Sequence, residues 1–139
     1  MPKLNLAEQS MIDYRQNFIN DSCFSNNIHA ITKMTNNEDQ YISSIAICVL
    51  AGLAECQDNH TDILSSNYPV TIARFISQKK DIIVHYTLQL IHNILIHGLP
   101  QTVGMAILFF PVRPFEELSE HTDPFIAENA RAIISILKI

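Results

Sequence analysis

The chain repeats one apolar pattern with a period of 41 or 42 residues. Ile42–Ala54 shifted by 41 residues falls on Ile83–Leu95, and a further shift of 42 reaches Phe125–Leu137, with five apolar pairs coinciding each time. In all three segments apolar residues recur at i, i+3, i+4 and i+7, which predicts a helix. A period of about 20–50 residues indicates units that stack, because such a unit cannot bury its apolar face alone.

The predicted long helices have recognisable start and stop residues. Asp81 and Asp123 are side-chain acceptors suited to N-capping, and Pro124 occupies the favoured first helical position. Asn36–Asp39 precedes the first long helix, and Gly98–Pro100 ends the second. The apolar arc of the second helix is broad, which predicts burial against neighbours on both sides.

Shorter helices are predicted between the long ones. Pro111 and Pro114 forbid one continuous helix over 100–118, so the third unit departs most from the pattern. Within it, Leu108–Val112 has two interpretations: its aromatic side chains fill the core between the second and third long helices, or they form an exposed docking surface. The other short helices are predicted at Asn5–Asn20, Ser25–Thr35, Thr61–Ser66 and Pro69–Ser77.

A unit of this length with two short helices and one long helix resembles the armadillo repeat, and HEAT units and other α-solenoids share the pattern. Asp81–Asn93 and Asp123–Ile133 carry the resemblance; the second resembles the start of the third helix of such repeats. The resemblance implies an all-α fold, a short right-handed α-solenoid of about three repeats at 24–57, 61–98 and 100–139. A capping helix is expected at about 4–20, and 1–139 is expected to form one domain.

The resemblance also implies where a ligand binds. Armadillo-type modules are mostly non-catalytic, and their successive third helices line a concave groove for an extended peptide. In peptide-binding members an Asn late in the third helix hydrogen-bonds the peptide backbone, and Asn93 matches that place, whereas Gly52 and Ser135 do not. The alternative for Asn93 is an amide that binds the carbonyls of an adjacent loop. Helical spacing predicts the groove residues Ser44, Cys48, His85, Gln89, Asn93, Arg131 and Ser135.

One subgroup of the family is excluded. Nuclear-import receptors place a Trp one turn before each Asn, to hold lysine side chains. The matching positions are Gln89, Cys48 and Arg131, and the sequence has no Trp. Binding of nuclear localisation signals in that manner is therefore not expected.

Composition excludes further function classes. Lys and Arg total 9 against 14 Asp and Glu, and the net charge of −5 is opposite to the basic stripe of nucleic-acid-binding proteins and disfavours anionic membranes. Only 3 glycines occur, without the clustering that phosphate-binding loops need. The longest nearly apolar stretch, 104–112, is too short to span a bilayer. We expect no nucleic acid, membrane or cofactor as a partner.

The cysteines are Cys23, Cys48 and Cys56, and none forms a CxxC pair. With an N-terminus that lacks the apolar core of a signal peptide, they predict a reducing compartment, the cytoplasm or nucleus. Cys48 and Cys56 lie in an apolar helix, where thiols usually pack as small hydrophobic groups. Neither is predicted to be a nucleophile.

The histidines and acidic residues indicate no catalytic or metal site. His85 and His92 are seven residues apart, about 10 Å along a helix, whereas two ligands on one helix need a spacing of i, i+4. His92 and His97 are five apart and diverge. The acidic cluster Glu116–Glu120 is interpreted as a solvated helix face, or as an attraction for a basic partner segment.

These observations predict a non-catalytic adaptor or scaffold that binds a peptide or helix of a partner protein in the groove. The alternative is a structural module that forms homodimers through open apolar ends, because Ile136–Ile139 carries no polar capping helix. A third hypothesis is a small enzyme with an unmarked site. The sequence does not identify the partner.

Overall fold

The computed structural model describes residues 25–65, 68–77 and 80–138, and every regular element in these ranges is helical. The prediction of an all-α chain is confirmed. The capping helix expected at 4–20 lies outside the described residues. In chain order the elements are α2 (Ser25–Met34), α3 (Gln40–Leu53), the 3-10 turn η1 (Gln57–Asn59), α4 (His60–Ser65), α5 (Tyr68–Ile76), α6 (Asp81–His97), α7 (Pro100–Phe109), α8 (Arg113–Leu118) and α9 (Pro124–Leu137).

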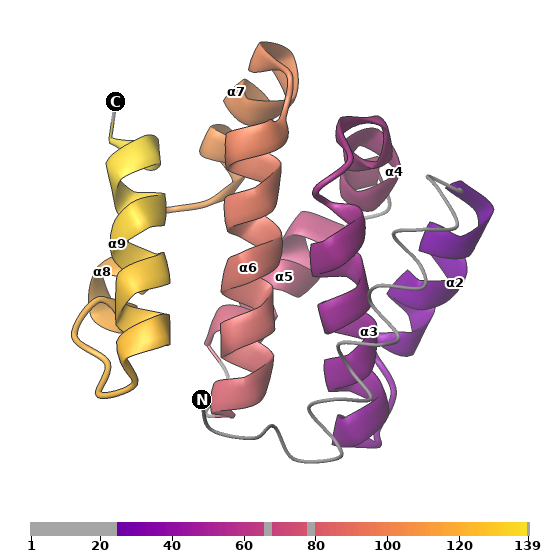
Figure 1. The fold of residues 1–139 in the computed structure, drawn as a ribbon, viewed down its shortest axis with the longest axis horizontal. Helices are drawn as coiled ribbons and strands as arrows, with labels where there is room; N and C mark the ends of the chain where they lie inside the picture. The colour runs from indigo at the N-terminus through magenta and orange to yellow at the C-terminus, as the bar shows by residue number, and fades with distance from the viewer. Residues whose placement is uncertain (1–24, 66–67, 78–79, 139) are drawn as a thin grey trace, which may run out of the picture.

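The three long helices α3, α6 and α9 lie side by side and run in the same direction (Figure 1). α6 is the middle helix and packs against both others. Leu88, Ile91 and Ile94 of α6 are fully buried, as the broad apolar arc predicts. This parallel set is the arrangement that the 41- or 42-residue period predicts.

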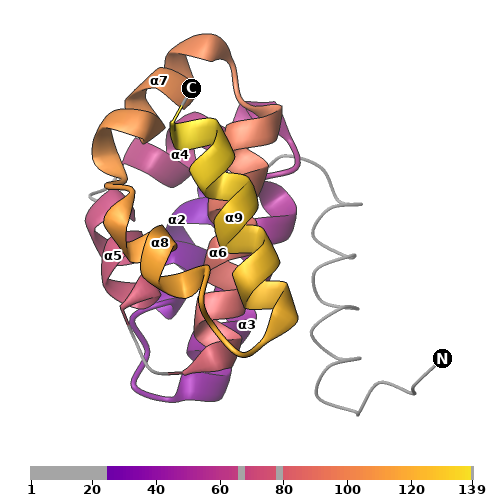
Figure 2. The same ribbon diagram turned by 90° about the vertical axis from the view of Figure 1, so that its left-hand side faces the viewer.

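The shorter helices α5, α7 and α8 form a second layer along one side of the long helices (Figure 2). α2 packs against α3, α5 against α6, and α8 against α9, so each long helix is paired with the short helix that immediately precedes it. A continuous cluster of buried apolar side chains runs from Ile28 in α2 to Leu137 in α9. The repeats therefore share one core.

The segment Leu108–Val112 is divided between core and surface. Phe110 is 2% exposed, and its ring meets the ring of Phe115 edge-on with 6.5 Å between centroids. Leu108 and Phe109 are 88% and 51% exposed. α7 ends at Phe109 and the backbone of Phe110 is extended, which turns neighbouring side chains to opposite sides. The core interpretation holds for Phe110 and fails for Leu108 and Phe109.

The N-cap prediction is confirmed at Asp123 and wrong at Asp81. The Asp123 carboxylate accepts a hydrogen bond from the Phe125 N–H at 2.9 Å, and Asp39 caps α3 in the same way. Asp81 is instead the first residue of α6, and the N-cap residue Lys80 makes no side-chain capping bond. One position along the helix is enough to direct the Asp81 carboxylate away from the backbone N–H groups that a cap serves.

Two features concern the environment expected for the chain. In the part of the chain that the structure describes, no helix is both long and apolar enough to cross a membrane. Cys56 is disulfide-bonded, although the number and spacing of the cysteines predicted reduced thiols. The expected reducing compartment therefore gains no support from Cys56.

Gly98 connects α6 to α7 and has no space for a side chain. A Cβ atom there would lie 2.5 Å from the carbonyl oxygen of Ile94 and 3.0 Å from Cγ2 of Val103. Gly104, exposed within α7, offers the opposite situation, because no heavy atom lies within 4 Å of its Cβ position. The two glycines make a matched pair for a test of packing.

We expect Gly98→Ala to lower the free energy of unfolding by about 1–3 kcal/mol, because the backbone must shift to admit the methyl group. Gly104→Ala should raise it by about 0.5–1 kcal/mol, because alanine loses less conformational entropy in a helix. Urea unfolding followed by circular dichroism measures both changes. The same sign for both would contradict the close contact at Gly98.

His60, the first residue of α4, is a buried polar group close to the same connection. Its Nε2–H donates to the carbonyl of Ala54 at 2.6 Å, while its Nδ1 is buried with no hydrogen-bond partner among the described residues. Burial lowers the pKa of His60 below its ordinary value of 6.5; the hydrogen bond to Ala54 opposes this shift, and nearby His97 adds to it. A proton on Nδ1 would have no acceptor, so the folded state favours neutral imidazole.

We expect stability to fall as the pH drops below about 6.5, because the unfolded chain then binds a proton that His60 excludes in the folded state. The loss continues until the pH reaches the lower pKa of the folded state. His60→Gln keeps an N–H donor for Ala54 but does not titrate, so its melting temperature should fall less between about pH 7.5 and about pH 5. If this variant keeps the full pH dependence, the acid sensitivity belongs elsewhere, with His85 and His92 as candidates because burial also lowers their pKa values.

Candidate functional site

The polar face of α6 forms the centre of the candidate site. His85, Gln89 and Asn93 follow one line along the helix, and all three are half-buried. The fully buried residues of α6, such as Leu88 and Ile91, occupy the opposite and flanking faces. The structure therefore brings these three predicted groove residues together on the accessible face of the middle helix.

Asn93 uses its amide inside the protein. Its Nδ2 donates a hydrogen bond of 2.8 Å to the carbonyl of Ala51, which lies in the last turn of α3. The acceptor is thus a helix carbonyl of the preceding repeat, rather than the loop carbonyl considered as the alternative. The amide oxygen of Asn93 accepts no hydrogen bond from the described residues.

His85 and Gln89 form a small polar pair on the same line. The Gln89 Nε2 lies 3.3 Å from the His85 Nε2, a distance that suits donation from the amide to a neutral imidazole. Burial lowers the pKa of His85, and the Asp123 carboxylate partly opposes this shift. The His85 ring also meets the ring of Phe125 edge-on at 6.1 Å between centroids, which connects α6 to α9.

Ser44 and Cys48 of α3 are 2% and 1% exposed, although they occupy the positions that match His85 and Gln89. The Ser44 hydroxyl donates to the carbonyl of Tyr41 at 2.9 Å. His85 and Gln89 of α6, by contrast, are only half-buried. Ser44 and Cys48 therefore contribute no accessible contact in this structure.

Arg131 and Ser135 of α9 are exposed. The Arg131 Nη2 donates to the carbonyl of Ser119 at 3.0 Å, and the Ser135 hydroxyl donates to the carbonyl of Arg131 at 3.1 Å. The hydrogen bond of Arg131 thus runs to the end of α8 rather than to α6. Arg131 does not take part in the hydrogen bond between Gln89 and His85.

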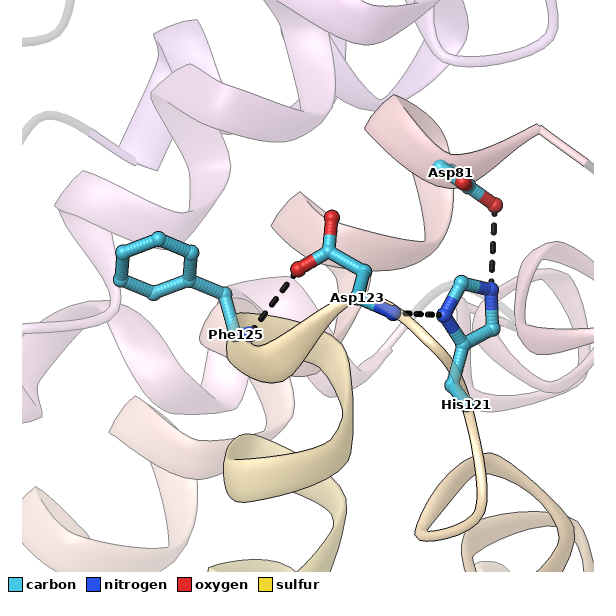
Figure 3. A network of polar contacts seen from close by, with 4 residues as sticks. All are labelled: Asp81, His121, Asp123 and Phe125. Atoms are coloured by element: carbon cyan, nitrogen blue, oxygen red, sulfur yellow. Dashed lines mark hydrogen bonds and ion pairs between the residues drawn. The ribbon is translucent and has the colours of Figure 1, made fainter.

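A polar network at the start of α6 and α9 was missed by the sequence analysis (Figure 3). The His121 Nε2–H donates to the Asp81 carboxylate at 3.2 Å, and the His121 Nδ1 accepts from the Asp123 N–H at 2.9 Å. The ring thus uses Nδ1 as an acceptor and Nε2 as a donor. Asp81 and Asp123 are 42 residues apart, one repeat, which indicates that the starts of α6 and α9 lie side by side. In the sequence analysis both residues were interpreted only as helix caps.

The described residues contain no group of three or more His, Cys, Asp and Glu side chains placed to hold a metal ion. His92 is half-buried, and its pKa is lowered by burial and by nearby His97. Neutral imidazoles on the accessible side of α6 can accept or donate single hydrogen bonds. The chemistry that this face offers is therefore hydrogen bonding by amides and imidazoles.

Solved structures show the same architecture. A designed armadillo repeat protein, YIII(Dq)4CqI, matches 77% of this chain and 45% of its own length with a TM-score of 0.69 and 13% identity. Another, solved in complex with the peptide (KR)4, matches 76% of this chain and 44% of its own at a TM-score of 0.69 and 12% identity. An engineered protein matches 81% of this chain and 27% of its own at 0.72 and 14%. The fold is an armadillo-like helical repeat.

The chain spans less than half the length of these matched structures. No family model and no curated protein sequence matches it. In the armadillo-like arrangement α3, α6 and α9 are the successive third helices, and α6 is the one with a long-helix neighbour on both sides. Folds of this kind are generally non-catalytic, because their extended stacked surfaces bind partners instead of enclosing a reaction site.

Proposed function

We propose that the protein is a non-catalytic adaptor that binds a peptide or helix of a partner protein along the face of α6 and α9. The observation that carries this proposal is the line of His85, Gln89 and Asn93 on the middle helix of an armadillo-like fold. Such folds commonly serve as protein-binding scaffolds. The peptide complex of the designed protein supports the same use of the fold.

Gln89 is the residue we assign to the centre of this surface. Its amide contacts only the imidazole of His85 among the described residues, at the long distance of 3.3 Å, so it can turn toward a ligand at little cost. Both a carbonyl acceptor and an N–H donor are then offered to a peptide backbone. Exposed Arg131, at the position of α9 that matches Gln89 in the repeat, adds a positive charge to the proposed surface.

We expect the double substitution Gln89→Ala and Arg131→Ala to weaken binding roughly tenfold or more, since each net hydrogen bond contributes about 0.5–1.5 kcal/mol. The ligand is a peptide selected from a displayed random library on the immobilised protein. Fluorescence anisotropy with the labelled peptide measures the dissociation constant. Gln101→Ala is the matched control, because Gln101 is an exposed glutamine on α7.

Asn93→Ala tests a different property and should be measured separately. It removes the bond to Ala51, so it should lower the free energy of unfolding by about 1 kcal/mol whether or not Asn93 contacts a ligand.

Selected peptides that bind the double variant and the native protein equally well would show that this face is not the binding surface.

A second candidate function, self-association, is favoured by a specific observation on α7. Leu108, Phe109 and Met105 are 88%, 51% and 52% exposed, and Leu99 immediately before α7 is 46% exposed. Large apolar side chains gathered on one helix are typical of an interaction surface. The proposal here is that a second copy of the chain covers them.

We expect Leu108→Gln to weaken a homodimer at least about tenfold, because Leu108 would lose the burial of a whole leucine side chain. Size-exclusion chromatography with light scattering over a concentration series measures the dimer. Ile82→Gln is the control, because Ile82 is 46% exposed at the opposite end of α6. A monomer at every concentration would remove this candidate function.

A further inference from the structure

A polar cavity of about 680 Å³ lies at the corner where the first and second repeats meet. The loop between α2 and α3 supplies one side, and the end of α5 with the first turn of α6 supplies the other. Its volume is within the range of about 300–1,000 Å³ that is usual for small-ligand sites. None of its lining residues belongs to the groove set on α3, α6 and α9.

Arg74 is the one basic side chain among the described residues that line this cavity. Its Nη2 donates to the Asn36 Oδ1 at 3.0 Å, and its guanidinium carbon lies 6.0 Å from the centroid of the Phe75 ring. These contacts hold the guanidinium at the cavity and leave other N–H groups of the fork to bind an acceptor. Arg74 forms no ion pair with the described residues, although Glu38 lines the same cavity.

The wall opposite Arg74 is fixed by internal hydrogen bonds. The buried Ser43 hydroxyl donates to the carbonyl of Thr35 at 2.7 Å, and the buried Thr35 hydroxyl donates to the carbonyl of Thr32 at 2.6 Å. Asn37 and Gln40 add amide side chains at the rim. The cavity therefore combines buried, hydrogen-bonded Thr35 and Ser43 with exposed amide groups and the single exposed guanidinium of Arg74.

The next corner of the same fold shows what this arrangement lacks. Between the second and third repeats, the Asp81 carboxylate accepts a hydrogen bond from His121, so the chain supplies both the donor and the carboxylate (Figure 3). At the corner between the first and second repeats, Arg74 supplies the donor, and the described residues supply no carboxylate in contact with it. A planar guanidinium can bind a carboxylate through two parallel hydrogen bonds, which add geometric specificity to the charge attraction. A carboxylate is therefore the peptide group that suits Arg74 best.

We propose that this cavity binds a carboxylate group of an extended peptide, with Arg74 as the ionic partner and the Asn37 and Gln40 amides on the adjoining peptide backbone. The carboxylate belongs to the C-terminus of the peptide or to an Asp or Glu side chain. Both sources present the same planar group to Arg74. The site is independent of the proposed groove, because the two use different residues.

Nitrogen-15 NMR titration of the full chain tests this site with three probes. They are acetylated trialanine with a free C-terminal carboxylate, acetylated and amidated Ala-Glu-Ala, and acetylated and amidated Ala-Gln-Ala. We expect the side-chain signals of Arg74, Asn36 and Asn37 to shift with one or both carboxylate peptides and not with Ala-Gln-Ala. The carboxylate peptide that binds identifies the source of the group.

Three variants give the result its specificity. Arg74→Gln should weaken binding at least about tenfold, and Glu38→Gln should strengthen it about two- to threefold, because it removes a like charge from the cavity. Because Glu38→Gln is expected to strengthen binding, loss of structure in the variant cannot produce the expected result. Arg113→Gln is the control for an exposed arginine elsewhere, on α8, and should leave the affinity unchanged.

The proposal is overturned if no probe shifts these signals at millimolar concentration, if Ala-Gln-Ala shifts them equally, or if Arg74→Gln binds as tightly as the native chain. The double variant Gln89→Ala and Arg131→Ala should lose binding of the library peptide and still show the shifts of the Arg74, Asn36 and Asn37 signals with the carboxylate peptides. Failure of the groove and failure of the cavity are therefore separate results.

Discussion

The packing of α6 between α3 and α9 determines the rest of the structure. Leu88, Leu90, Ile91 and Ile94 of α6 are fully buried, so the helix needs a neighbour on each flank and the short-helix layer behind it. A helix with a narrow apolar stripe could be covered by a single partner, but this arc is too broad for that. The line through Gln89 is the remaining face, and its position as a candidate binding surface follows from the packing.

Polar bonds fix the register of neighbouring repeats. Apolar burial is non-directional, so by itself it specifies weakly how far one unit is displaced along the next. Bonds between residues one repeat apart supply this information, because each is satisfied in a single register. Four of them join residues 38 to 42 positions apart: Arg74 with Asn36, Gln57 with His97, His121 with Asp81, and Asn93 with Ala51. The period seen in the sequence is thus close to the sequence separation of the residues that contact one another across neighbouring repeats.

The long helices and their common direction could be predicted because the repeat encodes the apolar arc of each helix. Accessibility within the groove could not, because it depends on what covers a position: Cys48 and Gln89 are equivalent in the repeat, yet Cys48 is 1% exposed and Gln89 is half-buried. A backbone carbonyl was one of the two interpretations for Asn93, but which carbonyl it binds could not be predicted, since a backbone carbonyl has no sequence signature. The site at Arg74 could not be predicted from the sequence, because its corner is formed by segments about 40 residues apart.

The bond of Asn93 is explained by the end of α3. The last carbonyls of a helix have no intrahelical partner, and three of the four here accept backbone N–H groups: Leu50 from Ala54, Gly52 from Glu55 and Leu53 from Cys56. The fourth, Ala51, accepts from the Asn93 amide of the next repeat. An Asn late in the third helix can therefore complete the C-terminus of the preceding third helix. A peptide that competed for the Asn93 N–H that donates to Ala51 would leave a helix carbonyl unsatisfied. In the proposed function, backbone recognition at Asn93 therefore falls to its amide oxygen and its second N–H, beside the Gln89 amide.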